Sequence, residues 1–178
     1  METKQRSLFV HSLIYGLILG AVMIVVSLIY YILDVNMFSI GFIFLSLVIS
    51  LVVVIVIILL GANSYRDRYL GGKISFKQCF LVGLIIGLVG FIISVAYNYI
   101  FMTYIEPGAM EEGINQFIDK WGDKMSEEDL DKTISKMQSM TPSKQFIRSL
   151  ITGAVISVIL SLIASLFVKK DKINQESI

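Results

Sequence analysis

A charged island at 64–77, with the sequence SYRDRYLGGKISFK, lies between two strongly apolar runs. Its Gly-Gly-Lys-Ile-Ser stretch is similar to the end of a phosphate-binding loop, in which backbone N–H groups and a lysine hold the phosphates of a nucleotide. That motif requires a glycine five residues before its second glycine, and a serine or threonine directly after the lysine. Asp67 and Ile74 occupy those two positions. The island therefore does not predict a nucleotide site of this type.

The basic residues of the island have a simpler interpretation as contacts to lipid headgroups or to a protein partner. Gly71 and Gly72 predict a chain reversal, and Ser75 or a neighbour predicts the start of the next helix. A cluster of four basic side chains is at the low end of what lipid recognition needs. The residues predicted to make headgroup or partner contacts are Arg66, Arg68, Lys73 and Lys77.

Catalytic groups are few in the rest of the chain. The one histidine, His11, lies just inside an apolar run, and those runs contain no carboxylate that could complete a proton relay. The one cysteine, Cys79, excludes a disulfide within this chain and, with a single histidine, a Cys/His metal cluster. No G-x-S-x-G nucleophile elbow is present. We predict no catalytic residue, no cofactor and no metal, and we expect a protein that is not an enzyme.

Acidic side chains near the third apolar run leave one catalytic alternative open. Glu106, Glu111 and Glu112 would bind a cation, or act on a lipid-linked substrate, if they converged on one cleft. Acids at the start of a helix also stabilise the positive end of its dipole, and this is the commoner explanation. A membrane enzyme is therefore the third hypothesis for function.

Four long apolar runs, at 8–33, 38–60, 79–104 and 146–168, must position these residues. Each run is long enough for a helix across the hydrocarbon core of a bilayer, which needs about 20 residues. Hydrophobic residues make up 56% of the chain, charged residues make up 16%, and Arg148 is the one charged side chain inside the runs. We predict an all-α fold, a four-helix transmembrane bundle.

The positions of lysine and arginine predict the orientation, because cytoplasmic flanks of membrane helices are enriched in them. Basic residues precede the first run, occupy the island and follow the fourth run, but they are absent from the short link 34–37. Four crossings place these three basic sites on one side, so both termini and the loop 61–78 are predicted to be cytoplasmic. Outside the island, the basic residues concerned are Lys4, Arg6, Lys169, Lys170 and Lys172.

The same count places segment 106–145 outside the cytoplasm. Its nine acids and five lysines do not oppose this, since long loops translocate largely regardless of charge. Apolar residues at helical spacing predict two amphipathic helices in it, the second capped by Ser126. Thr141 and Pro142 predict the N-cap and first turn of a helix that continues into the fourth run.

We therefore predict an extracytoplasmic helical hairpin inserted between the third and fourth spans. The predicted organisation has three parts. Residues 1–105 hold the first three spans, residues 106–145 form the insert, and residues 146–178 hold the fourth span and a cytoplasmic tail.

Small residues recur every four positions along the spans, and such rows let helices approach closely in lipid. We interpret them as packing faces, with a ligand path along the Gly83/Gly87 face as the alternative. The Leu/Val/Ile-rich second half of the second run is predicted to face lipid. The clearest rows are Ser12, Gly16 and Gly20; Gly83 and Gly87; and Gly153, Ser157, Ser161 and Ser165.

Asn98 departs from this pattern because a side-chain amide in hydrocarbon needs a polar partner. It predicts a polar pocket near the outer face of the membrane. Three neighbouring tyrosines predict an aromatic belt at the membrane interface. They are Tyr97, Tyr99 and Tyr104.

Several stretches of the chain resemble a known family. They are Tyr65-Arg66-Asp67, the following Gly71-Gly72-Lys73-Ile74-Ser75-Phe76, the Ile105-Glu106-Pro107 exit from the third run, and the Gly-rich first run. They are similar to the bacterial membrane-protein family catalogued as domain of unknown function 4199. Over nearly the whole chain, the resemblance implies four spans with an outer helical insert. Such proteins are typical of the Bacteroidetes group, which implies a bacterial inner membrane. The family has no assigned activity, so no catalytic residue is carried over.

These observations favour an integral inner-membrane protein that acts as a non-enzymatic scaffold or accessory subunit. The alternative is a small oligomeric transporter or lipid-handling protein, with Asn98 and the Gly83/Gly87 face lining its path. We expect membrane lipids as partners, together with a protein partner or a second copy of the chain, and no nucleic acid.

Overall fold

The computed structural model describes residues 2–36 and 38–168, and in this part of the chain it contains helices and no strand. Four of the helices are long and apolar enough to cross a membrane, which confirms the predicted all-α fold with four spans. Three basic residues used to predict the orientation, Lys169, Lys170 and Lys172, lie outside the described residues.

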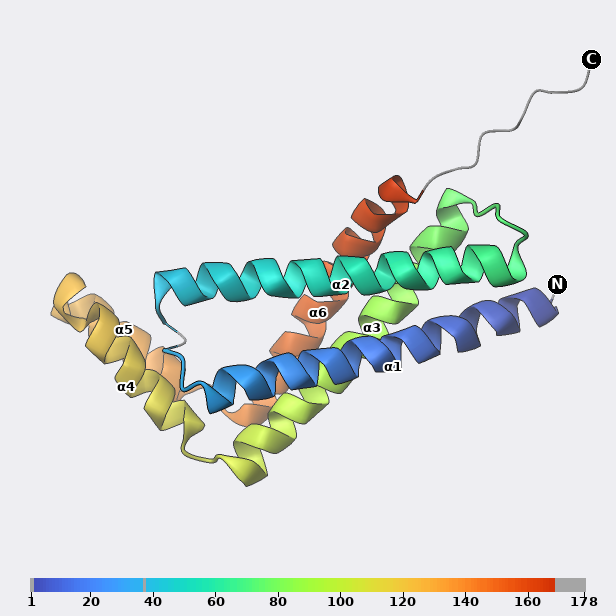
Figure 1. Ribbon diagram of the computed structural model, residues 1–178. Coiled ribbons are helices and arrows are strands. Elements are labelled where there is room, and N and C mark those ends of the chain that lie inside the picture. Colours follow the sequence, from blue (N-terminus) through green and yellow to red (C-terminus); the bar gives the residue numbers. More distant parts are fainter. Residues whose placement is uncertain (1, 37, 169–178) are drawn as a thin grey trace, which may run out of the picture.

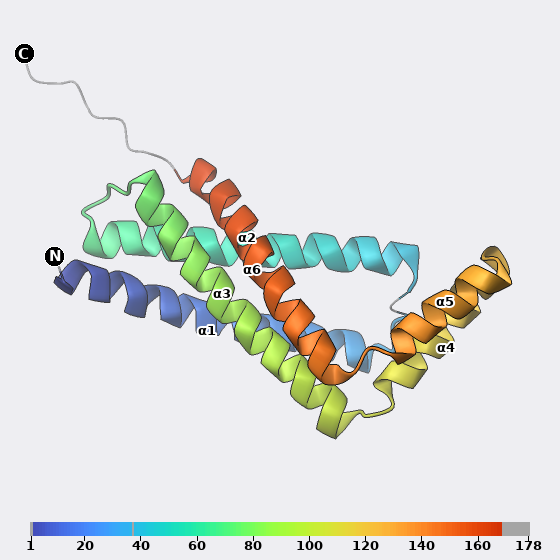
Figure 2. The ribbon, with the colours of Figure 1, turned by 180° about the vertical axis from the view of Figure 1, so that it is seen from behind.

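Helix α3 is the centre of the bundle, because it contacts α1 along one side and α6 along the other. Figures 1 and 2 show that α4 and α5 lie side by side at the end of the bundle away from the N-terminus. In chain order the elements are α1 (Glu2–Ile32), α2 (Ile40–Tyr69), α3 (Phe76–Ile100), the π-helical turn η1 (Phe101–Ile105), α4 (Ala109–Trp121), the 3-10 turn η2 (Gly122–Lys124), α5 (Glu127–Gln138) and α6 (Pro142–Phe167).

The small-residue rows pack the spans together, as predicted. A Cβ atom built on Gly16 would lie 2.6 Å from the Cβ of Val89, so α1 and α3 approach too closely there for any side chain. A Cβ on Gly87 would lie 2.9 Å from the Cβ of Ser157, which brings α3 equally close to α6. Close approach of this kind supplies the van der Waals contact that holds helices together in lipid.

Helix α2 is attached to the bundle through its C-terminal half. Its buried residues all lie between Val54 and Tyr65, and no residue of α2 before Val54 is buried. The prediction that the second half faces lipid is therefore wrong. Branched aliphatic side chains suit a protein core and a lipid tail equally well, so composition alone does not distinguish the two.

The turn after α2 is shorter than the predicted loop 61–78. Helix α2 continues to Tyr69, so the first part of the charged island is helical and its arginines lie in the last turn. There they complement the negative end of the helix dipole. Gly71 and Gly72 adopt positive φ angles of 60° and 87° and reverse the chain, as predicted. Ser75 then caps α3 in a capping box with Gln78.

Helices α5 and α6 follow the predicted capping pattern. Ser126 accepts a hydrogen bond from the backbone N–H of Asp129, and Thr141 caps α6 with Pro142 in its first turn. Both caps are confirmed, and α6 runs without interruption into the fourth span.

Helix α4 is docked on the link between α1 and α2. The Nε1 of Trp121 donates a hydrogen bond of 3.2 Å to the carbonyl oxygen of Phe38. The rings of Phe38 and Phe117 pack edge to face with centroids 5.5 Å apart. The N-terminal end of α2 is therefore fixed by the α4–α5 hairpin, while its C-terminal half is held by the bundle.

Candidate functional site

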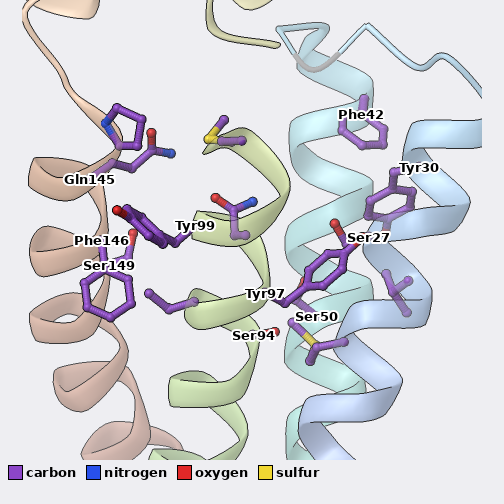
Figure 3. Close-up of a pocket in the computed structure, with 16 residues that line it drawn as sticks. Ser27, Tyr30, Phe42, Ser50, Ser94, Tyr97, Tyr99, Gln145, Phe146 and Ser149 are labelled. Carbon is purple, nitrogen blue, oxygen red and sulfur yellow. The ribbon is translucent and has the colours of Figure 1, made fainter. Parts of the chain in front are cut away.

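A cavity of about 410 Å³ lies between the α1–α2 pair and the α3–α6 pair, close to the hairpin (Figure 3). We refer to it as the Asn98 crevice, because the one residue predicted to mark a polar pocket lines it. Asn98 is also exposed, so the crevice opens to the surface at this position. Other lining residues come from all four spans, among them Ser27, Tyr30, Phe42, Ser94, Tyr99 and Gln145.

Aromatic rings form two walls of the crevice. On the α3–α6 side, the rings of Tyr99 and Phe146 have centroids 5.5 Å apart. On the α1–α2 side, Tyr30 and Phe42 meet edge to face at 4.9 Å (Figure 3). Tyr97 also lines the crevice, so two of the tyrosines predicted to form an interfacial belt are part of this site.

Two polar atoms in the walls of the crevice are buried without a hydrogen-bond partner in the described structure. They are the hydroxyl oxygen of Tyr30 and the Oε1 of Gln145. A buried polar group without a partner costs about 1–3 kcal/mol, and native proteins rarely retain one without a role. The two residues come from α1 and α6, on opposite sides of the crevice. In Figure 3 the two residues lie on opposite sides with α3 between them, so a ligand would need a separate polar group for each.

A second cavity of about 760 Å³ lies between the C-terminal half of α3, the N-terminal half of α6 and the α4–α5 hairpin. Four of the eight methionines of the chain line it, so we call it the Met cavity. Arg148 and Lys136 line it as well. Val95, Met102, Gln145 and Ser149 line both this cavity and the Asn98 crevice, which makes the two neighbouring parts of one site.

The basic residues of the island lie at the other end of the bundle (Figure 1). The Nε of Arg66 is 2.7 Å from the Oδ1 of Asp67, and the other three basic side chains are exposed. Their positions differ: Arg68 lies in the last turn of α2, Lys73 in the turn and Lys77 in the first turn of α3. The four line neither the Asn98 crevice nor the Met cavity.

The three acids of the catalytic alternative have different neighbours. Glu106 accepts a hydrogen bond of 2.8 Å from the hydroxyl of Tyr31, and Glu112 accepts one from the side chain of Gln116. Glu111 lines a separate hollow between α4 and α5. Among the described residues, no three His, Cys, Asp or Glu side chains are grouped so that they could hold a metal ion.

Sequence reasoning missed Tyr30, Gln145 and the cavity role of Arg148. A tyrosine near the end of a span and a polar residue before the next span are both ordinary features of membrane helices. Only the crossing of α1 over α3, and the return of α6, brings them to one crevice. An arginine one turn from the end of a span likewise predicts contact with headgroups and no cavity.

Comparison with known proteins identifies the family. The family model described as "Protein of unknown function (DUF4199)" matches residues 14–170. The chain belongs to this family. The DUF4199 match includes all of α2, α3 and α6 and most of α1, and it confirms the resemblance seen in the island and at the exit of the third span. No curated protein and no solved structure matches the chain.

Proposed function

We propose that this DUF4199 chain is a non-enzymatic protein of a bacterial inner membrane that binds a membrane lipid in the Asn98 crevice. The observation that carries the proposal is the pair of buried, unpartnered polar atoms on Tyr30 and Gln145. A lipid offers ester carbonyls, which accept from the Tyr30 hydroxyl, and a headgroup with a hydrogen-bond donor for the Oε1 of Gln145, both close to acyl chains. Such a ligand would satisfy the polar atoms while its chains contact the aromatic walls.

The packing of the glycine rows limits where a partner or a ligand path can lie under either hypothesis from the sequence. Gly16 faces Val89, and Gly87 faces Ser157, so these faces are used inside the chain. They give no support to a docking surface for a scaffold partner or a second copy. The same contacts fill the Gly83/Gly87 face, where a Cβ on Gly83 would lie 2.9 Å from Ile58. The proposed lipid site therefore lies at Asn98 and not along that face.

We further propose that both termini and the turn between α2 and α3 face the cytoplasm, which places the hairpin outside. The basic island at one end of the bundle supports this orientation, because cytoplasmic flanks of membrane helices are enriched in lysine and arginine. A cysteine-labelling experiment tests it, because Cys79 is the one native thiol and is buried.

In a Cys79→Ala background, Ser135→Cys on α5 should react with a membrane-impermeant maleimide in spheroplasts, since Ser135 is exposed. Asp67→Cys on α2, which is also exposed, should react only after the membrane is opened. The reverse labelling pattern would contradict the proposed orientation. Labelling of both positions in sealed spheroplasts would show a mixed topology and would contradict it as well.

Retention of lipid by the purified protein tests the binding site. Ser94 lines the crevice, and Ser94→Leu should fill part of it and lower the amount of copurifying lipid several-fold. Ser46→Leu is the matched control, because Ser46 lies on α2 outside the lining of the crevice. Mass spectrometry of lipids extracted after detergent exchange provides the measurement. Equal lipid content in the two variants would count against the site.

Tyr30→Phe separates a ligand site from an unoccupied hollow. If the crevice bound nothing, removing a buried hydroxyl without a partner would be neutral or stabilising. If a lipid accepts or donates a hydrogen bond there, Tyr30→Phe should reduce lipid retention while the lipid-free protein keeps its stability. Unchanged retention would contradict the role given to this hydroxyl.

A further inference from the structure

The Met cavity combines an adaptable apolar surface with positive charge. Methionine side chains are flexible and polarisable, and they line surfaces that accept apolar ligands of varied shape. Lys136 from α5 and Arg148 from α6 lie among them, and no acidic side chain is among the described residues that line the cavity. The lining residues that are methionines are Met102, Met110, Met137 and Met140.

Lys136 and Arg148 are exposed, and unlike Lys132 neither forms a salt bridge with a described residue. Lys132, one turn before Lys136 on α5, lies 2.6 Å from Glu128, with which it forms a salt bridge. Lys144, one turn before Arg148 on α6, donates a hydrogen bond of 3.2 Å to the carbonyl oxygen of Ser139. Within the described part of the chain, no carboxylate lies within ion-pair distance of Lys136 or Arg148.

We propose that the Met cavity binds the headgroup region of an anionic phospholipid, with Arg148 and Lys136 on the phosphate. This inference rests on the proposed lipid-binding function and names the class of lipid. Charge complementarity carries it, because a guanidinium forms paired hydrogen bonds to phosphate oxygens and an ammonium adds a point charge. A zwitterionic lipid also presents a phosphate, but its own cation offsets that charge, so we expect Arg148 and Lys136 to favour an anionic lipid.

The connection between the two cavities explains how one lipid occupies both. Gln145 and Ser149 lie on the same face of α6 and line the Met cavity and the Asn98 crevice together. The phosphate lies beside Arg148, the hydroxyl-bearing glycerol of the headgroup lies beside Gln145, and an acyl chain extends toward Phe42 and Tyr99. The unpartnered Oε1 of Gln145 then accepts a hydrogen bond from a hydroxyl of the glycerol headgroup, as phosphatidylglycerol supplies.

Thermal stabilisation of the delipidated full-length protein by defined lipids tests the inference. The probes are dioleoyl phosphatidylglycerol, which is anionic, dioleoyl phosphatidylcholine, which is zwitterionic, and inorganic phosphate alone. A ligand that binds only the folded state raises Tm in proportion to its affinity and concentration. We expect phosphatidylglycerol to raise Tm most, and inorganic phosphate to have no effect at the same concentration.

Two double variants test whether Arg148 and Lys136 cause the preference for phosphatidylglycerol. Arg148→Gln with Lys136→Gln should weaken phosphatidylglycerol binding about tenfold or more, the loss expected for charge-assisted hydrogen bonds, and weaken phosphatidylcholine binding less, so that the preference for the anionic lipid is lost. Lys144→Gln with Lys132→Gln removes the same charge one turn away on the same two helices, and it should keep the preference for phosphatidylglycerol.

The outcomes separate the two proposals. If no lipid raises Tm and none is retained, the proposed function fails and this inference fails with it. If both lipids bind equally and the Arg148/Lys136 variant changes nothing, the lipid-binding function stands and the anionic class is overturned. An equal loss in the control variant would show that the preference comes from general surface charge, and stabilisation by inorganic phosphate would identify a free anion as the ligand. Both results overturn the inference.

Discussion

Substituting Gly16 with alanine should lower the free energy of unfolding by about 1–3 kcal/mol, the usual cost of overpacking a filled core. The added Cβ would lie 2.6 Å from the Cβ of Val89 and 3.2 Å from the carbonyl oxygen of Ile86. Neither atom is at the end of a flexible side chain, so α1 and α3 must move apart. This predicted destabilisation is opposite in sign to the effect of helix propensity, since alanine in a helix is otherwise more stable than glycine by about 1 kcal/mol.

Gly41→Ala is the control for this prediction. Gly41 lies on α2, and nothing lies within 4 Å of a Cβ built there, so the same chemical change should be neutral or slightly stabilising. Equilibrium unfolding in mixed micelles measures both variants. Combining Gly16→Ala with Val89→Gly moves the side chain from one helix to the other and should recover part of the loss. A neutral Gly16→Ala would contradict the close α1–α3 contact.

Local features of the fold were predictable because they depend on residues close in sequence. Ser75, Ser126 and Thr141 cap helices at the expected positions, and the two glycines of the island have the positive φ angles that a chain reversal needs. The number of spans followed from the length of the apolar runs. The C-terminal end of α2 was not predicted. The charges at Arg66 and Arg68 mark the end of the apolar segment, but the helix continues beyond that point.

The candidate site was only partly predictable. Asn98 stood out because its type is unusual inside an apolar run. Tyr30 and Gln145 lie far apart in sequence and have no unusual spacing, so only the tertiary arrangement shows that they share a crevice. The burial of the second half of α2 also depends on the tertiary arrangement, because it follows from where α3 passes. The sequence pattern of α2 alone does not indicate the position of α3.

Replacing His11 with alanine should have the second large effect, a loss of about 2–4 kcal/mol in the free energy of unfolding. His11 is buried, and its Nε2 lies 3.0 Å from the carbonyl oxygen of Gly61 on α2. Because a carbonyl oxygen only accepts, Nε2 carries the proton. The ring also contacts Tyr15, Tyr65 and Tyr69, with centroids 4.9, 5.5 and 5.6 Å away.

The contacts of His11 with Gly61, Tyr65 and Tyr69 lie in the C-terminal half of α2, which packs against the bundle. Loss of these contacts should therefore affect the position of the whole helix. His11→Phe keeps a ring and removes the hydrogen bond, and it should cost about 1 kcal/mol, which separates the two contributions. Phe9→Ala is the matched control on α1, because Phe9 is 54% exposed and its removal should change the free energy of unfolding little.

Since α2 also supplies Phe42 to the Asn98 crevice, His11→Ala should reduce lipid retention at the far end of the bundle. Full retention in a destabilised His11→Ala protein would show that the hairpin alone positions the outer half of α2.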